Sequence, residues 1–300
     1  MMQKRTGTYT LIAALCATLF LLPGCGEQVL VFHPVGPVGQ VEKQMIILSI
    51  VMVSIVVIPV IALLWVIVVR YRDTPDNPTP YRPEWSESRT LEFLWWAVPI
   101  VIIGVLGFVT VQKTFALVRP PGKVINPLTI QVTSLDWKWL FQYPGQKIAT
   151  VNYCEIPANR PIEFVLTSNA PMNSFWVPQL GGQEYTMPGM AMKLWLEADQ
   201  PGVYFGSGAN FSGEGFSHMH FHVIARPQSD FDHWVQRIKS TAPPLTTQQY
   251  AVLAQRTIVQ PMSFSTNQPG LFEKIVSQDG GMYMRRDLMK GKVNTHVGTD

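Results

Sequence analysis

The sequence predicts a two-helix transmembrane hairpin, then an all-β external domain, then a partly helical C-terminal extension. Two apolar stretches without a charged residue lie before residue 117, and each is long enough to cross a bilayer core as a helix. The segment that follows consists of short β-rich runs punctuated by Pro-Gly and Gly-Gly pairs. We therefore divide the chain into four segments, 1–24, 25–116, 117–226 and 227–300.

The first segment has the features of a secretory signal. Lys4 and Arg5 precede an uncharged apolar run over 9–22, and the run 22–25 resembles the sequence at which lipoprotein signals are cleaved. We expect a lipoprotein signal peptide over 1–24, cleavage before Cys25, and a covalent lipid on the Cys25 sulfur, a diacylglycerol with palmitate chains. The alternative is a plain signal anchor with an incidental cysteine.

The second segment carries both membrane spans. Residues 45–69 contain no charge and predict one helix, and residues 93–111 form the uncharged part of a second helix expected over about 92–115. The short loop between them carries the arginines typical of a cytoplasmic loop, Arg70, Arg72, Arg82 and Arg89. We therefore expect a multi-pass protein of a bacterial inner membrane, with everything after residue 117 in the periplasm.

Glu92 lies at the inner end of the second predicted span. A carboxylate at this depth is costly unless it faces protein or water, which makes it a functional candidate by default. The alternative is a side chain that only reaches back to the headgroup region.

The third segment predicts a sandwich or barrel of short strands. In the aromatic run 136–144, alternation places Trp137, Trp139 and Phe141 on one face of a strand. The other predicted strands are 129–133, 162–166, 193–196 and 218–224.

The last segment changes character. Ser229 is expected to cap a helix that runs through Lys239, with an apolar stripe of Phe231, Trp234, Val235 and Ile238. Residues 246–256 predict a second helix, and apolar residues recur over 262–265 and 271–276. The apolar stripe requires burial, either against the β domain or against a partner subunit.

Metal-binding residue types are scarce outside one run. Cys16, Cys25 and Cys154 are the cysteines; the first two fall in or beside the signal, and Cys154 reads as a small buried hydrophobe. One free thiol cannot build a two-thiolate metal centre or a disulfide framework. In a strand, His218, His220 and His222 would share one face and offer three imidazoles to copper or zinc.

Two stretches carry a resemblance to a known family. The runs 211–219 and 172–175 resemble subunit II of haem–copper oxidases, in the branch that oxidises quinol instead of cytochrome c. The cytochrome c branch has a dinuclear copper site, and its matching positions here are Asn173, Gly208, Asn210, Ser212, Phe216 and Met219. Only the methionine remains a copper ligand, because Gly, Ser and Phe offer copper nothing comparable with thiolate or imidazole.

The resemblance implies a cupredoxin-like Greek-key sandwich without dinuclear copper. It also implies a partner subunit I that holds the haems and a single copper, further small membrane subunits, and a complex that oxidises ubiquinol, reduces dioxygen to water and pumps protons. This chain would then bind no cofactor of its own and take no electrons from cytochrome c. By the same resemblance, Glu92 matches a residue at the cytoplasmic mouth of a proton channel. Trp137 matches the Trp that accepts the electron in the cytochrome c branch, but without copper behind it we expect Trp137 only to pack.

Other readings remain open. One is a stand-alone membrane lipoprotein that carries copper on its β domain through His218, His220 and His222. Another is a structural scaffold without any oxidase role. The net charge of +3 is small and unclustered, so we expect no nucleic-acid partner.

Overall fold

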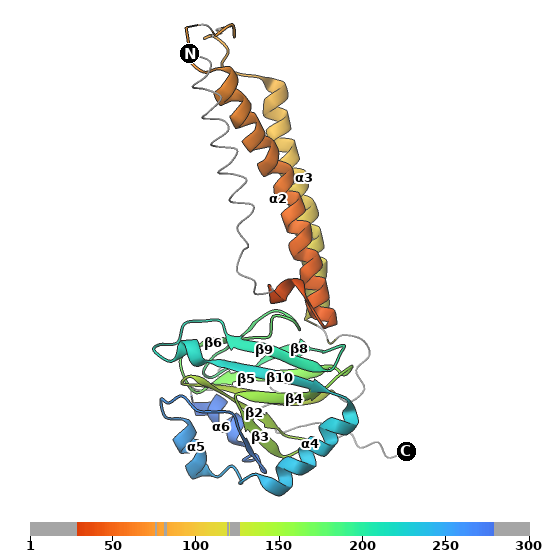
Figure 1. Ribbon diagram of the computed structural model, residues 1–300, viewed down its shortest axis with the longest axis vertical. Helices are drawn as coiled ribbons and strands as arrows, with labels where there is room; N and C mark the ends of the chain where they lie inside the picture. The colour runs from red at the N-terminus through yellow and green to blue at the C-terminus, as the bar shows by residue number, and fades with distance from the viewer. Residues whose placement is uncertain (1–28, 76, 81–82, 119, 121–126, 279–300) are drawn as a thin grey trace, which may run out of the picture.

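The computed structural model describes residues 29–75, 77–80, 83–118, 120 and 127–278. The predicted signal peptide, Cys16 and Cys25 lie outside this range, as does the end of the chain from residue 279. Figure 1 shows a long helical hairpin standing on a compact β domain. Two of the described helices are long and apolar enough to cross a membrane, by length and composition.

The hairpin consists of α2 (Pro37–Arg70) and α3 (Arg89–Leu117). The predicted start of the first helix at residue 45 was wrong, because α2 begins eight residues earlier with a proline at its first position, which favours a helix start. Its first turn buries Val38 and Gly39. Ser88 caps α3 by accepting a hydrogen bond from the Leu91 amide at 3.5 Å.

The β domain is a sandwich of two sheets. One has six strands in the order β11-β3-β2-β1-β5-β8, and the other has five in the order β4-β10-β9-β6-β7. Because β1 lies beside β5 and β4 beside β10, the chain passes repeatedly between the sheets, as a Greek-key sandwich requires. The strands are β1 (Leu128–Leu135), β2 (Lys138–Tyr143), β3 (Ile148–Val151), β4 (Tyr153–Pro157), β5 (Ile162–Ser168), β6 (Asn173–Trp176), β7 (Glu184–Thr186), β8 (Met192–Leu196), β9 (Gly202–Gly208), β10 (His220–Arg226) and β11 (Met262–Phe264).

Aromatic rings fill the space between the sheets. Trp139 meets Phe175 and Phe221 edge to face, with ring centroids 5.5 Å apart in both pairs. Phe175 and Phe221 stack on each other at 4.8 Å. These contacts between β2, β6 and β10 fix the two sheets at the end of the sandwich where the predicted site lies.

The C-terminal extension packs on the β domain in two ways, partly on the outer face of the six-stranded sheet and partly against the core between the two sheets. Its helices are α4 (Gln228–Thr241), α5 (Thr247–Leu253) and α6 (Leu271–Gln278), and they group around β2 and β3 on the side of the domain away from the hairpin (Figure 1). The predicted stripe on α4 is confirmed, since all four of its residues are buried. The extension therefore packs on the β domain of its own chain, and both faces of β2 are buried.

The starts of α4 and α5 differ from the predicted helix starts. Ser229 lies inside α4, which begins after Pro227 without a side-chain cap, so the predicted cap was wrong. Thr246 forms a capping box with Gln249 at the start of α5, shorter than the predicted 246–256.

Candidate functional site

The predicted copper-ligand positions come together at one end of the sandwich. Asn173 begins β6, Gly208 ends β9, and the loop between β9 and β10 carries the other positions. Pairing of β6 with β9 places Phe175 opposite Gly208, and the Gly208 amide donates to the Met219 carbonyl at 2.9 Å. The loop is therefore closed at its base, and its side chains converge on Asn173.

The Asn173 side chain occupies the centre of this convergence. Its Nδ2 donates to the Met219 Sδ at 3.0 Å and to the Ser212 Oγ at 3.3 Å. Its Oδ1 accepts from the backbone amides of Ser174 at 2.7 Å and Asn210 at 3.3 Å. Asn173 is fully buried, so this one amide satisfies donors and acceptors from three segments of the chain.

The missing side chain of Gly208 makes room for the Asn173 amide. A Cβ at Gly208 would lie 2.7 Å from the Asn173 Oδ1, which is closer than real contacts allow. Asn210 contributes through its side chain as well, because the Ser174 Oγ donates to the Asn210 Oδ1 at 3.0 Å. We call Asn173, Ser174, Asn210, Ser212 and Met219 the Asn173 network.

Phe216 lies outside this network. It begins the short helix η2 (Phe216–His218) and packs edge to face on Phe211, with ring centroids 5.7 Å apart. Phe211 itself is 80% exposed. The position at which the copper branch carries histidine therefore faces an exposed aromatic neighbour here.

The donor set does not fit a dinuclear copper centre. Thiolates and imidazoles are the ligands that hold copper of this kind, and the network offers neutral amides, a hydroxyl and one thioether. That thioether is already a hydrogen-bond acceptor of both Asn173 and Ser212. The arrangement supports hydrogen bonding and packing, and we derive no redox step from it.

Trp137 does not share a face with Trp139 and Phe141, so that prediction was wrong. It lies before β2 in the left-handed region, with φ of 63°, and its Nε1 donates to the Ser212 carbonyl at 3.1 Å. The loop packs closely on the indole, because a Cβ at Gly215 would lie 2.3 Å from the ring. Trp137 is therefore a half-buried wall of a surface pocket, and Trp139 is the core residue.

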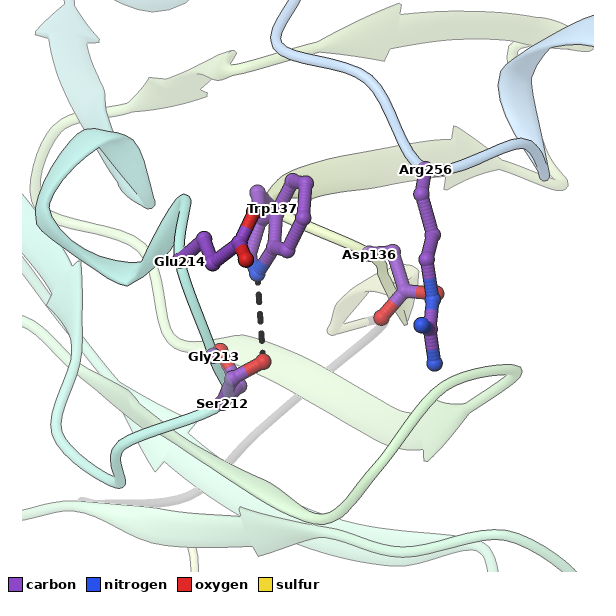
Figure 2. Close-up of a pocket in the computed structure, with 6 residues that line it drawn as sticks. All are labelled: Asp136, Trp137, Ser212, Gly213, Glu214 and Arg256. Carbon is purple, nitrogen blue, oxygen red and sulfur yellow. Dashed lines mark hydrogen bonds and ion pairs between the residues drawn. The ribbon is translucent and has the colours of Figure 1, made fainter.

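The pocket at Trp137 is polar. Figure 2 shows Glu214 and the Asp136–Arg256 ion pair on either side of the indole, with Ser212 and Gly213 below it. The Arg256 Nε lies 3.1 Å from the Asp136 Oδ2, but the guanidinium is largely exposed, so the pair contributes little to stability.

Lys138 is a buried cation that the sequence pattern did not predict. Its Nζ donates to the carbonyls of Leu253 at 2.9 Å and Gln255 at 2.7 Å, at the C-terminal end of α5. Cations are favoured at such helix ends. Burial lowers the pKa of Lys138, and the nearby Asp136 carboxylate acts in the opposite direction. The contact fixes the extension beside Trp137.

The prediction that His218, His220 and His222 share one face of a strand was wrong at its first residue. His218 belongs to η2, and β10 begins at His220, so only His220 and His222 share the exposed face of the strand. His220 stacks on Phe205 instead, with ring centroids 6.3 Å apart. Within the part of the chain that the structure describes, no three His, Cys, Asp or Glu residues are grouped as metal ligands would be.

The remaining candidates lie apart from the network. Cys154 is fully buried, which confirms it as a core residue, and burial together with the Glu155 carboxylate raises the pKa of its thiol. Glu92 is exposed and lies in the first turn of α3. That helix begins at the end of the hairpin away from the β domain (Figure 1).

Comparisons with known proteins agree with this architecture. The family described as "Cytochrome C oxidase subunit II, periplasmic domain" matches residues 140–226. Quinol oxidase subunit 2 of Bacillus cereus is 44% identical over 269 residues, covering 89% of this chain and 92% of the relative. Cytochrome bo(3) ubiquinol oxidase subunit 2 of Pseudomonas aeruginosa is 42% identical over 87% of this chain and 79% of its own length. Ubiquinol oxidase subunit 2 of Acetobacter aceti is 41% identical over 91% and 90%. The chain therefore belongs to the quinol oxidase subunit 2 family.

Proposed function

We propose that this chain is the non-redox subunit II of a proton-pumping terminal oxidase that oxidises ubiquinol and reduces dioxygen to water. Two of its relatives are named for ubiquinol oxidases, which supports this donor. A partner subunit I holds the haems and a single copper, and further small membrane subunits complete the complex. The hairpin lies in a bacterial inner membrane, and the β domain lies in the periplasm.

One observation carries the proposal: the Asn173 amide fills the position at which a copper-binding relative needs metal ligands. Its four hydrogen bonds satisfy Met219, Ser212 and two backbone amides, so the loop is held without a metal. A soluble donor such as cytochrome c needs an electron acceptor at the protein surface. Quinol dissolves in the bilayer and delivers electrons directly to subunit I, so this domain need not conduct them.

Metal content tests the proposal directly. The purified complex, titrated with copper, is expected to show no purple absorption from a mixed-valence copper pair and no copper beyond the one in subunit I. The triple variant His218→Ala, His220→Ala, His222→Ala tests whether these histidines hold any extra copper. Stoichiometric extra copper that survives in the triple variant would contradict the proposal. Extra copper that disappears in the triple variant would favour the copper-carrying alternative.

Glu92 is proposed as the residue of this chain that takes part in proton uptake. Its position in the first turn of α3, beyond the periplasm-facing half of the hairpin, supports this role. A carboxylate there faces either water or a partner subunit, and both allow proton transfer. It is a proton-conducting group and not a ligand of any cofactor.

Cys25 is proposed as the mature N-terminus, with a thioether-linked diacylglycerol. The hairpin already anchors the chain, so the lipid is dispensable for membrane attachment. The intact mass of the purified subunit is expected to match a chain that begins at Cys25 plus lipid. A chain that begins at Met1, or a Cys25 thiol that alkylates freely, would contradict this.

A further inference from the structure

A short apolar turn precedes the hairpin and is only partly covered by the rest of the chain. Val29 leads into the helical turn η1 (Leu30–Phe32), and hydrogen bonds from the Phe32 amide to the Val29 carbonyl at 2.9 Å and from the His33 amide to the Leu30 carbonyl at 3.0 Å close it. The η1 residues are half-buried, and Val29 is 60% exposed. Four consecutive apolar residues therefore leave part of their surface uncovered, and an apolar surface is suited to cover it.

The turn lies at the level where the hairpin meets the β domain. Figure 1 shows η1 beside the base of α2, on the hairpin side of the domain. The first turns of α2 carry Gln40, Glu42 and Lys43, and the uncharged run begins at Met45. With a rise of 1.5 Å per residue, α2 therefore projects about 12 Å beyond its uncharged run before reaching Pro37. The turn contacts α2, whose first turns are this polar stretch.

The chain directly after the turn is fixed to the β domain. The Val35 amide donates to the Gln179 carbonyl at 2.7 Å, and the Asp199 amide donates to the Val35 carbonyl at 2.8 Å. Gly36 passes so close to the domain that a Cβ there would lie 2.1 Å from the Glu197 carbonyl oxygen. The turn itself is therefore held in a defined position relative to the domain.

We propose that residues 29–32 insert into the interfacial layer of the outer leaflet and form a contact between the periplasmic domain and lipid. Continuity with the hairpin favours lipid as the occupant, because η1 contacts α2 at the end where that helix leaves the bilayer. The turn also carries no charge and no side-chain hydrogen-bonding group, which suits an acyl-chain boundary. Together with the backbone bonds of Val35, this contact limits how far the domain can tilt over the membrane.

The test is a nitroxide label at Val29→Cys in the whole complex, placed in phosphatidylethanolamine and phosphatidylglycerol bilayers. Collisions with oxygen report lipid, and collisions with a water-soluble nickel chelate report water. Val252→Cys on the distal helix α5 is the water reference, and Val60→Cys within α2 is the lipid reference; both side chains are exposed, by 58% and 57%. The parent chain sets the background, because its described cysteine, Cys154, is buried.

The label at residue 29 is expected to collide more often with oxygen than with the nickel chelate. Adding Phe32→Asp should reverse this ratio, and adding Phe32→Leu should keep it. A ratio equal to that at residue 252 would overturn the proposal, because the turn would lie in water. Protection from both reagents would overturn it as well, because a partner protein would then cover the turn.

Discussion

Asn173→Ala tests whether hydrogen bonds replace a metal at the end of the sandwich. The substitution removes an amide that is fully buried and bonded to four groups. The Ser174 amide is left buried without its acceptor, whereas the Asn210 amide is half-exposed and can bond water. The loop between β9 and β10 is then held by the Gly208 to Met219 backbone bond and by the Trp contacts.

The expected loss follows from these contacts. One buried unsatisfied donor costs about 1–3 kcal/mol, and the lost bonds to Ser212 and Met219 add roughly 1 kcal/mol. The local free energy of opening should therefore fall by about 2–4 kcal/mol, which corresponds to roughly a 30-fold to several-hundred-fold faster amide exchange. Ser212→Ala removes one partly exposed hydroxyl from the same network and should cost about 1 kcal/mol or less.

Hydrogen–deuterium exchange of the purified complex, read on peptides that span 208–219, measures this difference. Quinol oxidation per haem should be unchanged in Asn173→Ala complexes, because the network conducts no electrons. If exchange in the Asn173→Ala complex matched that in Ser212→Ala, the amide would not be the element that holds the loop. A fall in turnover without a change in exchange would contradict the non-redox role.

Three further predictions concern other parts of the chain. Gly36→Val should lower the free energy of unfolding by about 1–3 kcal/mol, because it forces a side chain against the Glu197 carbonyl, and it should speed limited proteolysis near residue 36. Gly145→Val is the control, because no atom lies within 4 Å of its Cβ, and it should leave the rate of proteolysis unchanged. Glu92→Ala should lower turnover several-fold with normal haem content, and Glu92→Asp should keep part of the rate; unchanged turnover would return Glu92 to the headgroup reading. Burial raises the pKa of Tyr250 to about 12. Because the unfolded chain ionises Tyr250 near pH 10, the free energy of unfolding should fall between about pH 10 and pH 12. The Tyr250→Phe chain lacks this ionisation, so over that pH range it should lose roughly 1 kcal/mol less stability than the parent chain in thermal melts, after allowance for the half-exposed ring.

The hairpin and five of the eleven described strands were predictable because their signals are local. Uncharged apolar length identifies a span, and alternation identifies a strand, without reference to the rest of the molecule. The start of α2 was not predicted, because its first turns carry Gln40, Glu42 and Lys43 and so lie outside the uncharged run that marks the span. They are helical because Pro37 starts the helix and Val38 is buried against the β domain, which is a tertiary contact that no local pattern reports.

Some residues of the site could be identified from the sequence, and others could not. The resemblance identified six positions, Asn173 among them. The structure brings Gly208, Asn210, Ser212 and Met219 into contact with Asn173, and Phe216 packs on Phe211 instead. The alternation rule failed at His218 and at Trp137, because a helical turn and a residue with positive φ interrupt the strands there. Lys138 could not be predicted, since its acceptors lie more than a hundred residues away in the extension.

The electron donor that the assembled complex accepts tests whether this chain serves a quinol oxidase. Membranes that contain this subunit in its complex should consume oxygen with a short-chain ubiquinol and not with reduced cytochrome c. Trp137→Ala should lower the amount of assembled complex more than the rate per haem, because the indole holds the loop through Ser212. Salt-sensitive oxidation of cytochrome c at a rate that matches the quinol rate would contradict the non-redox role, because an electron acceptor would then exist at the surface of this domain.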